Sequence, residues 1–295
     1  MAVTERVSAT LPAAEEIAAR RSRVLTKFLR SRSATFGAVL VGLFILIAIL
    51  APLIAPYAPD KTNFLALRKP PSAMHWLGTD EIGRDILSRV MYGGIASLYA
   101  GVVSVVIALA IGLPVGLAAG WFGGWIDAII SRATDALLAV PFLILAIAFA
   151  AVLGPSLTNA MIAIGLSQVP IFIRLTRGQV LAVKAEDFVE GARAVGVPNM
   201  LILVRHITPN ITAPLLVQAT LTTATSIIAE ASLSFLGLGQ QPPAPSWGSM
   251  LNTAKNFLDQ APWMSLFPGA AICLVVLGFN LLGDGLRDAL DPRED

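Results

Sequence analysis

The chain has 295 residues, of which 56% are hydrophobic and only 14% are charged. Soluble globular domains carry roughly 25% charged residues, so this chain lacks the charge to cover a surface of its size in water. A net charge of +2 gives no basis for nucleic-acid binding, and the single cysteine, Cys273, excludes a disulfide framework within the chain. The composition therefore predicts a protein that lies largely in a membrane.

Long uncharged apolar stretches recur along the sequence, and a helix that crosses a membrane needs about 20 such residues. The first stretch lies between Arg32 and Asp60. Another, over residues 136–173, is too long for one helix and is divided at Gly154 and Pro155, which favour a turn. We expect an all-α, polytopic protein with about six transmembrane helices, over residues 34–55, 96–119, 127–152, 157–174, 211–236 and 265–283.

Most of the 21 Lys and Arg residues fall on one side of these expected helices. Because basic residues near the ends of spans favour the cytoplasmic side, both termini are expected in the cytoplasm. Residues 1–33 then form a basic segment at the inner surface, and residues 284–295 form a short inner tail. Residues 56–95 and 237–264 are expected to be outer loops.

The inner segment over residues 175–210 is much longer than a helix–helix connection, which usually takes 2–8 residues. Residues 184–195 place apolar side chains on one helical face, and Gly196 is a typical helix stop. Pro198 suits the first turn of a second helix, which we expect to end before Pro209. Two short helices around a glycine would form a rigid element able to transmit movement from a soluble partner.

The spacing in this segment resembles the signature of permeases in binding-protein-dependent ABC importers. That pattern is Glu-Ala-Ala, glycine after three further residues, and a later Ile-x-Leu-Pro. The chain departs from it at Gly191, at His206 in place of Ile and at Thr208 in place of Leu. In the family this element is the coupling helix that docks on the ATPase subunit. The resemblance implies an ATPase contact at Glu190, Gly191, Ala192, Gly196 and Pro209.

Three further segments resemble the dipeptide, oligopeptide and glutathione permeases, in the subunit with a long first external loop. These segments are His75–Arg89, Phe235–Gly248 and Phe279–Pro292. The resemblance implies a type I importer permease fold in the bacterial cytoplasmic (inner) membrane. It also implies alternating access with a second permease subunit, two ATPase subunits and an extracytoplasmic binding protein.

The sequence contains no GxxxxGK[ST] element, which is the loop that binds nucleotide phosphates in many ATPases. We therefore expect a transport subunit without enzymatic activity, cofactor or metal of its own, with ATP and magnesium bound by the partner ATPases. A glutathione or nickel importer of the same family is the alternative. An ion-coupled carrier is a more distant alternative. An intramembrane hydrolase is another, and it is disfavoured because His75 and His206 both lie outside the expected spans.

Polar residues in two of the expected spans have alternative interpretations. Glu230 lies toward the outer end of the fifth span, where a buried acid costs about 2.5–3.5 kcal/mol on insertion scales. It either lines the translocation path and meets the amine of the substrate, or it is a structural acid at the helix end or across a permease dimer. Arg132 and Asp135 are three residues apart and are expected to pair near the inner boundary.

Overall fold

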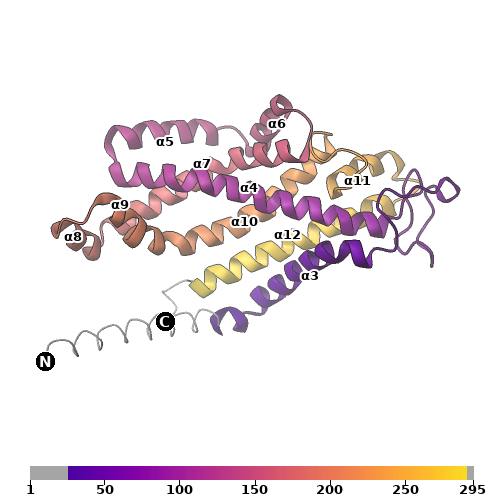
Figure 1. Ribbon diagram of the computed structural model, residues 1–295, viewed down its shortest axis with the longest axis horizontal. Helices are drawn as coiled ribbons and strands as arrows, with labels where there is room; N and C mark the ends of the chain where they lie inside the picture. The colour runs from indigo at the N-terminus through magenta and orange to yellow at the C-terminus, as the bar shows by residue number, and fades with distance from the viewer. Residues whose placement is uncertain (1–25, 291–295) are drawn as a thin grey trace.

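A computed structural model describes residues 26–290, which form an elongated bundle of helices without strands in that part of the chain (Figure 1). The expected basic segment up to residue 25 and the expected tail from residue 291 lie outside the described residues. In chain order the helices are α3 (Arg32–Ile54), α4 (Ile86–Phe122), α5 (Gly124–Leu138), α6 (Phe142–Leu153), α7 (Leu157–Lys184), α8 (Asp187–Ala194), α9 (Asn199–Ile202), α10 (Thr208–Phe235), α11 (Trp247–Ala254) and α12 (Trp263–Leu290). Single turns of 3₁₀- or π-helix lie at Phe64–Ala66, Leu203–Ile207 and Lys255–Phe257.

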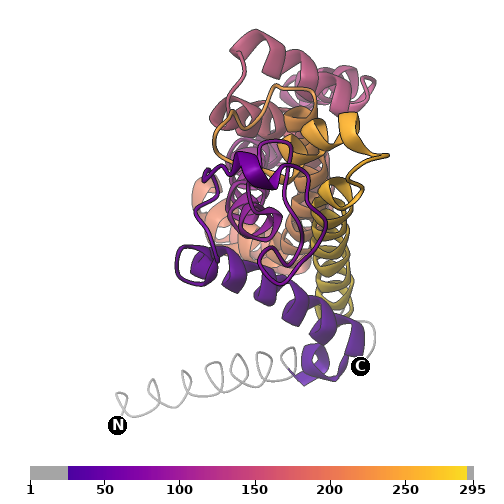
Figure 2. The same cartoon turned by 90° about the vertical axis from the view of Figure 1, so that its right-hand side faces the viewer.

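The two ends of the bundle differ in architecture. At the end that we call the loop end, residues 55–85 and the segment around α11 cover the helices (Figure 1). Figure 2 looks directly onto this end, where the irregular chain of residues 55–85 crosses in front of the bundle. The opposite end carries α8 and α9, and the start of α3 and the end of α12 lie toward the same side.

Five helices of the described chain are long and apolar enough to cross a membrane. A sixth span results if α5 and α6 count as one, although the two helices meet at an angle of 91°. The span expected over residues 127–152 therefore corresponds to two helices joined by a sharp bend. Pro141 precedes α6 with extended backbone angles, and its ring and missing N–H prevent α5 from continuing as a regular helix.

Two of the spanning helices extend well beyond their apolar stretches. α4 begins at Ile86, inside the expected outer loop, because the Asp85 carboxylate caps its first turn by accepting a hydrogen bond from the Ser88 N–H. α7 continues past residue 174 to Lys184 and takes up the first part of the expected inner segment. The expected span boundaries mark where the apolar residues end. The helices α4 and α7 extend beyond those boundaries because their backbone hydrogen bonds continue into more polar sequence.

Glycines spaced four residues apart let α4 and α7 approach closely. They are Gly112, Gly116 and Gly120 on one face of α4. A Cβ atom on Gly116 would lie 2.6 Å from Cβ of Thr176, and one on Gly120 would lie 2.7 Å from Cβ of Val180. Side chains larger than hydrogen therefore do not fit in this seam, which follows the small-residue rule of membrane helix packing. The seam fixes α7 against α4 over the half of the bundle that leads to α8.

Candidate functional site: the α8–α9 segment

The predicted helix before Gly196 is present as α8, and its end is closed by a specific cap. The Val197 N–H donates to the Ala192 carbonyl oxygen at 3.1 Å, and the Gly196 N–H donates to the Arg193 carbonyl oxygen at 3.0 Å. These two bonds form a Schellman motif, which needs a left-handed residue, and Gly196 supplies it with a φ of 78°. Gly196 therefore ends α8 as the sequence predicts.

The second expected helix does not end before Pro209, and that prediction is wrong. α9 passes into a π-helical turn, Leu203–Ile207, which leads directly into α10. The Thr208 N–H and the Thr208 hydroxyl both donate to the carbonyl oxygen of Leu203. Because Pro209 stands in the first turn of α10, its missing N–H leaves the helix uninterrupted.

Apolar side chains and one tryptophan anchor the α8–α9 segment, residues 185–210, to the bundle. Val189, Ile202 and Ile207 are fully buried in a cluster that includes Trp121, at the end of α4. The Arg193 guanidinium lies 4.3 Å from the centre of the Trp121 ring. Lys184 Nζ, at the end of α7, donates to the Trp121 carbonyl oxygen at 2.7 Å, so Trp121 contacts both the last residue of α7 and the last turn of α8.

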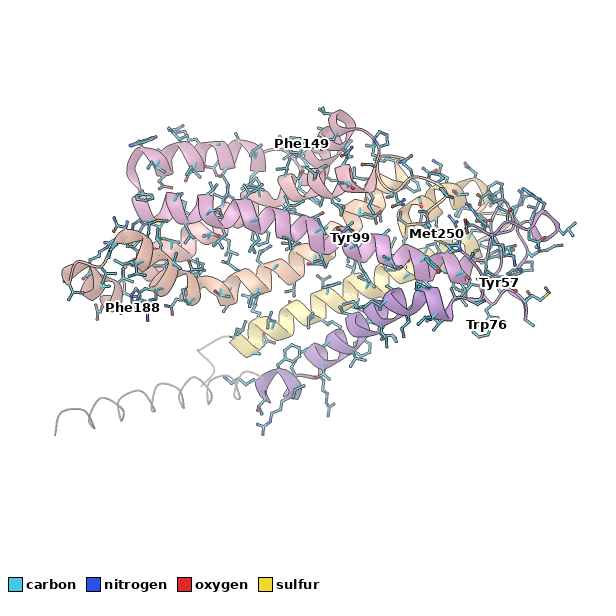
Figure 3. All side chains as sticks on the ribbon, in the orientation of Figure 1. Tyr57, Trp76, Tyr99, Phe149, Phe188 and Met250 are labelled. Carbon is cyan, nitrogen blue, oxygen red and sulfur yellow. The ribbon has the colours of Figure 1, made fainter. Side chains whose placement is uncertain are left out.

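The outer face of this segment remains apolar and exposed. The exposed side chains are Phe188, Val195, Met200, Leu201 and Val204. Figure 3 shows Phe188 at the extreme end of the bundle, away from the spanning helices. The predicted contact residues lie on the same segment: Glu190, Gly191, Gly196 and Pro209 are exposed, and Ala192 is half-buried.

Ion pairs between α5 and α7 replace the pair expected within one helix. Asp135 pairs with Arg174 at 2.6 Å, not with Arg132, and Asp127 pairs with Arg177 through both guanidinium nitrogens that face it. The expectation of an Arg132–Asp135 pair is therefore wrong. The two observed pairs hold α5 against α7, close to the residues that anchor α8.

A second polar cluster lies at the loop end and holds residues 55–85 in place. Asp85 binds His75 Nδ1 at 2.9 Å and accepts two hydrogen bonds from Ser88 at 2.8 Å. Asp80 accepts from Arg84 Nε at 2.6 Å, and Arg89 Nε lies 3.5 Å away. These buried acids make an irregular segment rigid.

Glu81 adjoins this cluster, and burial is the main reason that its pKa is raised above the usual value for a glutamate. The neighbouring Asp80 carboxylate raises the pKa further. The Arg84 guanidinium, which donates to Glu81 Oε1 at 2.7 Å, opposes the shift.

The structure places Glu230 inside the bundle. Its side chain is fully buried and accepts hydrogen bonds from Ser97 on α4 at 2.8 Å and from Ser234 on α10 at 2.6 Å. In this conformation the carboxylate reaches neither the surface nor a dimer contact, so it does not line a path here. Instead, it ties α4 to α10 below the loop end.

The sequence analysis did not identify Trp121, Lys184 and Arg177 as parts of the α8 support. One available signal was the position of Trp121 and Lys184 near the inner ends of the second and fourth expected spans. Within residues 26–290, no group of three or more His, Cys, Asp or Glu side chains is placed to hold a metal ion.

Comparison with protein families identifies the chain. Residues 112–295 match the family described as the binding-protein-dependent transport system inner membrane component. The chain belongs to this family of inner-membrane permeases. Residues 20–71 also match the amino-terminal transmembrane domain of oligopeptide transport permease C.

The permease is similar to named transport proteins over most of its length. It is 50% identical to the dipeptide transport system permease protein DppC of Alkalihalophilus pseudofirmus, over 90% of this chain and 87% of that protein. It is also 50% identical to the glutathione transport system permease protein GsiD of Shigella flexneri, over 90% of this chain and 88% of that protein. It is therefore a multi-pass membrane subunit of an ABC importer, not an enzyme.

A solved structure with the same fold is an inward-facing form of the MetNI methionine ABC transporter. The matched chain has a TM-score of 0.55 and 22% identity, and the match covers 70% of this permease and 98% of that chain. The fold is that of a type I ABC importer permease, as expected. Family membership excludes the ion-coupled carrier and the intramembrane hydrolase considered from the sequence.

Proposed function

We propose that this permease forms half of the translocation path of an importer for dipeptides or short oligopeptides, and that the α8–α9 segment receives the ATPase. The observation that carries the coupling proposal is the exposed apolar face of the α8–α9 segment, in which α8 is capped at Gly196 and contacts Trp121 through Arg193. Apolar side chains at the end of a bundle, outside its lipid-facing length, suit contact with a soluble protein.

The path for movement is a continuous set of packed elements. A push on α8 reaches α4 through Trp121, α5 through the Arg177–Asp127 pair, and α7 through the glycine seam. In this proposal the ATPases bind ATP and magnesium, and this chain binds neither. The end with α8 and both chain termini then lie in the cytoplasm, and the loop end faces the binding protein.

The other members of the complex follow from the family. We propose a second permease subunit, two ATPase subunits and an extracytoplasmic binding protein, because the family is that of binding-protein-dependent transport. Dipeptide cargo is supported by the similarity to DppC. Glutathione is the second candidate cargo, because the identity to GsiD is equally high.

The coupling proposal is tested by purifying the tagged permease from its own membranes in mild detergent and quantifying the chains that accompany it. Phe188→Arg and Glu190→Arg place new positive charge on the face of α8, and we expect both to lose most of the ATPase while retaining the second permease. Leu65→Arg is the matched control, since Leu65 is 93% exposed at the opposite end. Retention of the ATPase by both α8 variants would contradict the proposal.

The cargo proposal needs a separate measurement. Uptake of labelled dialanine and of labelled glutathione is compared in vesicles that contain the complete complex and its binding protein. We expect uptake of dialanine that depends on ATP, and uptake of glutathione alone would reassign the cargo to the second candidate.

A further inference from the structure

An open pocket of about 430 Å³ lies at the loop end, where four parts of the chain meet. Its walls come from residues 55–85, from the first turns of α4, from the start of α7 at Leu157 and from the loop between α10 and α11. Its polar and aromatic lining and the prolines opposite are Asp60, Tyr92, Tyr99, Gln240, Pro243 and Pro245. Pockets that bind small molecules commonly have volumes of about 300–1,000 Å³.

Asp60 is the charged member of the described lining, and its carboxylate is not neutralised by an ion pair within residues 26–290. The charges of Arg89 and Asp60 interact, but Arg89 makes its contacts elsewhere, because its Nη1 donates to the Pro59 carbonyl oxygen at 2.8 Å and its Nε lies 3.5 Å from Asp80. The Asp60 carboxylate therefore lies in the pocket lining without an ion-pair partner among residues 26–290.

The remaining surface of the pocket suits an organic cation with a small apolar body. Tyr92 and Tyr99 bring aromatic rings, which attract cations at their faces. Pro243 and Pro245 bring apolar surface from the opposite loop. A carboxylate, aromatic rings and prolines together are complementary to an ammonium group that is attached to a short chain.

Glu230 links two walls of this pocket, α4 and the loop that follows α10, through its hydrogen bonds. Its partner Ser97 follows the lining residue Ala96 on α4, and its partner Ser234 accepts a hydrogen bond from the N–H of Gln240 at 3.0 Å. The buried carboxylate thus links α4 to the loop that closes the pocket. In this arrangement Glu230 is a positioning residue, and Asp60 is the acid that faces the pocket.

We propose that this pocket receives the α-ammonium group of a peptide through Asp60 as the peptide enters the permease. The inference rests on the proposed function, since it requires peptide cargo and a loop end that faces the binding protein. It adds a defined contact on this chain, and it transfers the recognition of the amine from Glu230 to Asp60.

The first test measures uptake of labelled dialanine at saturating binding protein in vesicles containing the complete complex. Asp60→Asn removes the charge at nearly constant volume, and we expect the maximal rate to fall by about two- to fivefold, the usual effect of losing one charge pair at an exposed site. Asp259→Asn is the matched control, because Asp259 is an exposed acid of the loop end outside the pocket. Equal rates for Asp60→Asn and wild type would overturn the proposal.

The second test detects occupancy without relying on transport. In a Cys273→Ser background, Ile95→Cys places one thiol in the pocket wall, and its rate of modification by a membrane-impermeant maleimide is measured on the complex. We expect dialanine at high concentration to slow the modification by at least about twofold, and N-acetyl-dialanine, which lacks the ammonium group, to have no effect. The protection should disappear when Asp60→Asn is added. Equal protection by both peptides, or protection that persists in Asp60→Asn, would show that the ammonium group is not what the pocket binds.

The outcomes separate this inference from the proposed function. If the wild-type complex carries dialanine but Asp60→Asn does so equally well, the pocket assignment fails and the importer remains. If the wild-type complex carries no dialanine, the cargo proposal fails and the pocket assignment fails with it. Loss of the ATPase in the α8 variants tests coupling in either case.

Discussion

The two ends of this permease are stabilised in different ways. At the loop end, buried acids are matched by donors within the chain: Asp85 is bonded to His75 and Ser88, and Asp80 to Arg84. At the α8–α9 end, apolar anchors and a glycine cap hold the backbone, while the side chains of Phe188 and its neighbours remain exposed. The loop end is held by ion pairs and hydrogen bonds to its buried aspartates, whereas the α8–α9 end is held by apolar anchors and backbone caps; both ends expose apolar side chains, such as Leu65 at the first and Phe188 at the second.

This difference indicates where each end gets its rigidity. A buried carboxylate is costly unless donors surround it, so the loop end holds one conformation as long as the network is complete. The α8–α9 segment can keep its shape without such a network, because a helix and its cap are local structures. The surface that we propose as the ATPase contact is therefore built on local structure.

The largest expected effect comes from the glycine seam in the half of the bundle that leads to α8. Gly116→Leu places a side chain where Thr176 already lies, and overpacking against a backbone seam should cost more than about 3 kcal/mol. We expect loss of folded protein, measured as the monodisperse fraction in gel filtration. Gly42→Leu on α3 has open space around it and should remain folded. A folded Gly116→Leu variant would show that α4 and α7 can separate without harm.

The loop-end network is broken by Asp85→Ala. Removing this carboxylate uncaps α4 and leaves His75 and Ser88 without their partner, which should lower stability by about 3 kcal/mol. The measurement is the thermal unfolding temperature in detergent. Asp259→Ala, at an exposed acid of the same end, should change it little. Equal unfolding temperatures would mean that the network does not stabilise this end.

Two substitutions in the α8–α9 segment should act in opposite directions. Gly191→Ala meets open space and replaces a poor helix former, so it should stabilise α8 by about 0.5–1 kcal/mol. Gly196→Ala forces a side chain into a left-handed conformation, which costs about 1–2 kcal/mol. We expect ATPase affinity to rise about two- to fivefold in the first variant and to fall by a similar or larger factor in the second. Identical changes in both would contradict the role of the cap.

The smallest expected effect concerns pH at the loop end. Because burial raises the pKa of Glu81, its contribution to stability is present below the ordinary glutamate pKa and is lost as the pH rises through the raised value. Glu81→Gln cannot lose a proton, so its stability does not fall over this pH range. The unfolding temperature of the variant minus that of the wild type should therefore be larger at pH 7 than at pH 4. The corresponding difference in the free energy of unfolding should stay below about 1 kcal/mol, because solvent screens the Glu81 carboxyl. Glu186→Gln, at an exposed acid before α8, is the control.

Local sequence patterns were enough to predict several elements. The apolar stretches predicted the spanning helices to within a few residues at α3, where the stretch and the helix coincide. Gly196 predicted the end of α8, because a helix stop depends on neighbours within one turn. The prediction failed at Pro209, since a proline in a helical first turn and a proline that ends a helix look alike in sequence.

Contacts between distant residues could not be predicted in the same way. Asp135 and Arg174 are 39 positions apart, whereas Arg132 is only three positions from Asp135, so sequence spacing favoured the wrong partner. Glu230 stood out as an acid in a span, but its partner Ser97 lies 133 positions away. Nothing local shows which of the serines on other helices will face such an acid.

The sequence by itself determined that this chain is a helical membrane protein with a short helix that ends at Gly196, because span length and a helix stop are set by near neighbours, and its resemblance to a known family indicated a permease. Only the tertiary structure decided that α5 and α6 meet at 91°, that Glu230 is buried, and that Asp60 faces an open pocket. The physical reason is that burial and pairing depend on which helix faces meet. Close approach of backbones along the glycine seam fixes how two of those faces meet.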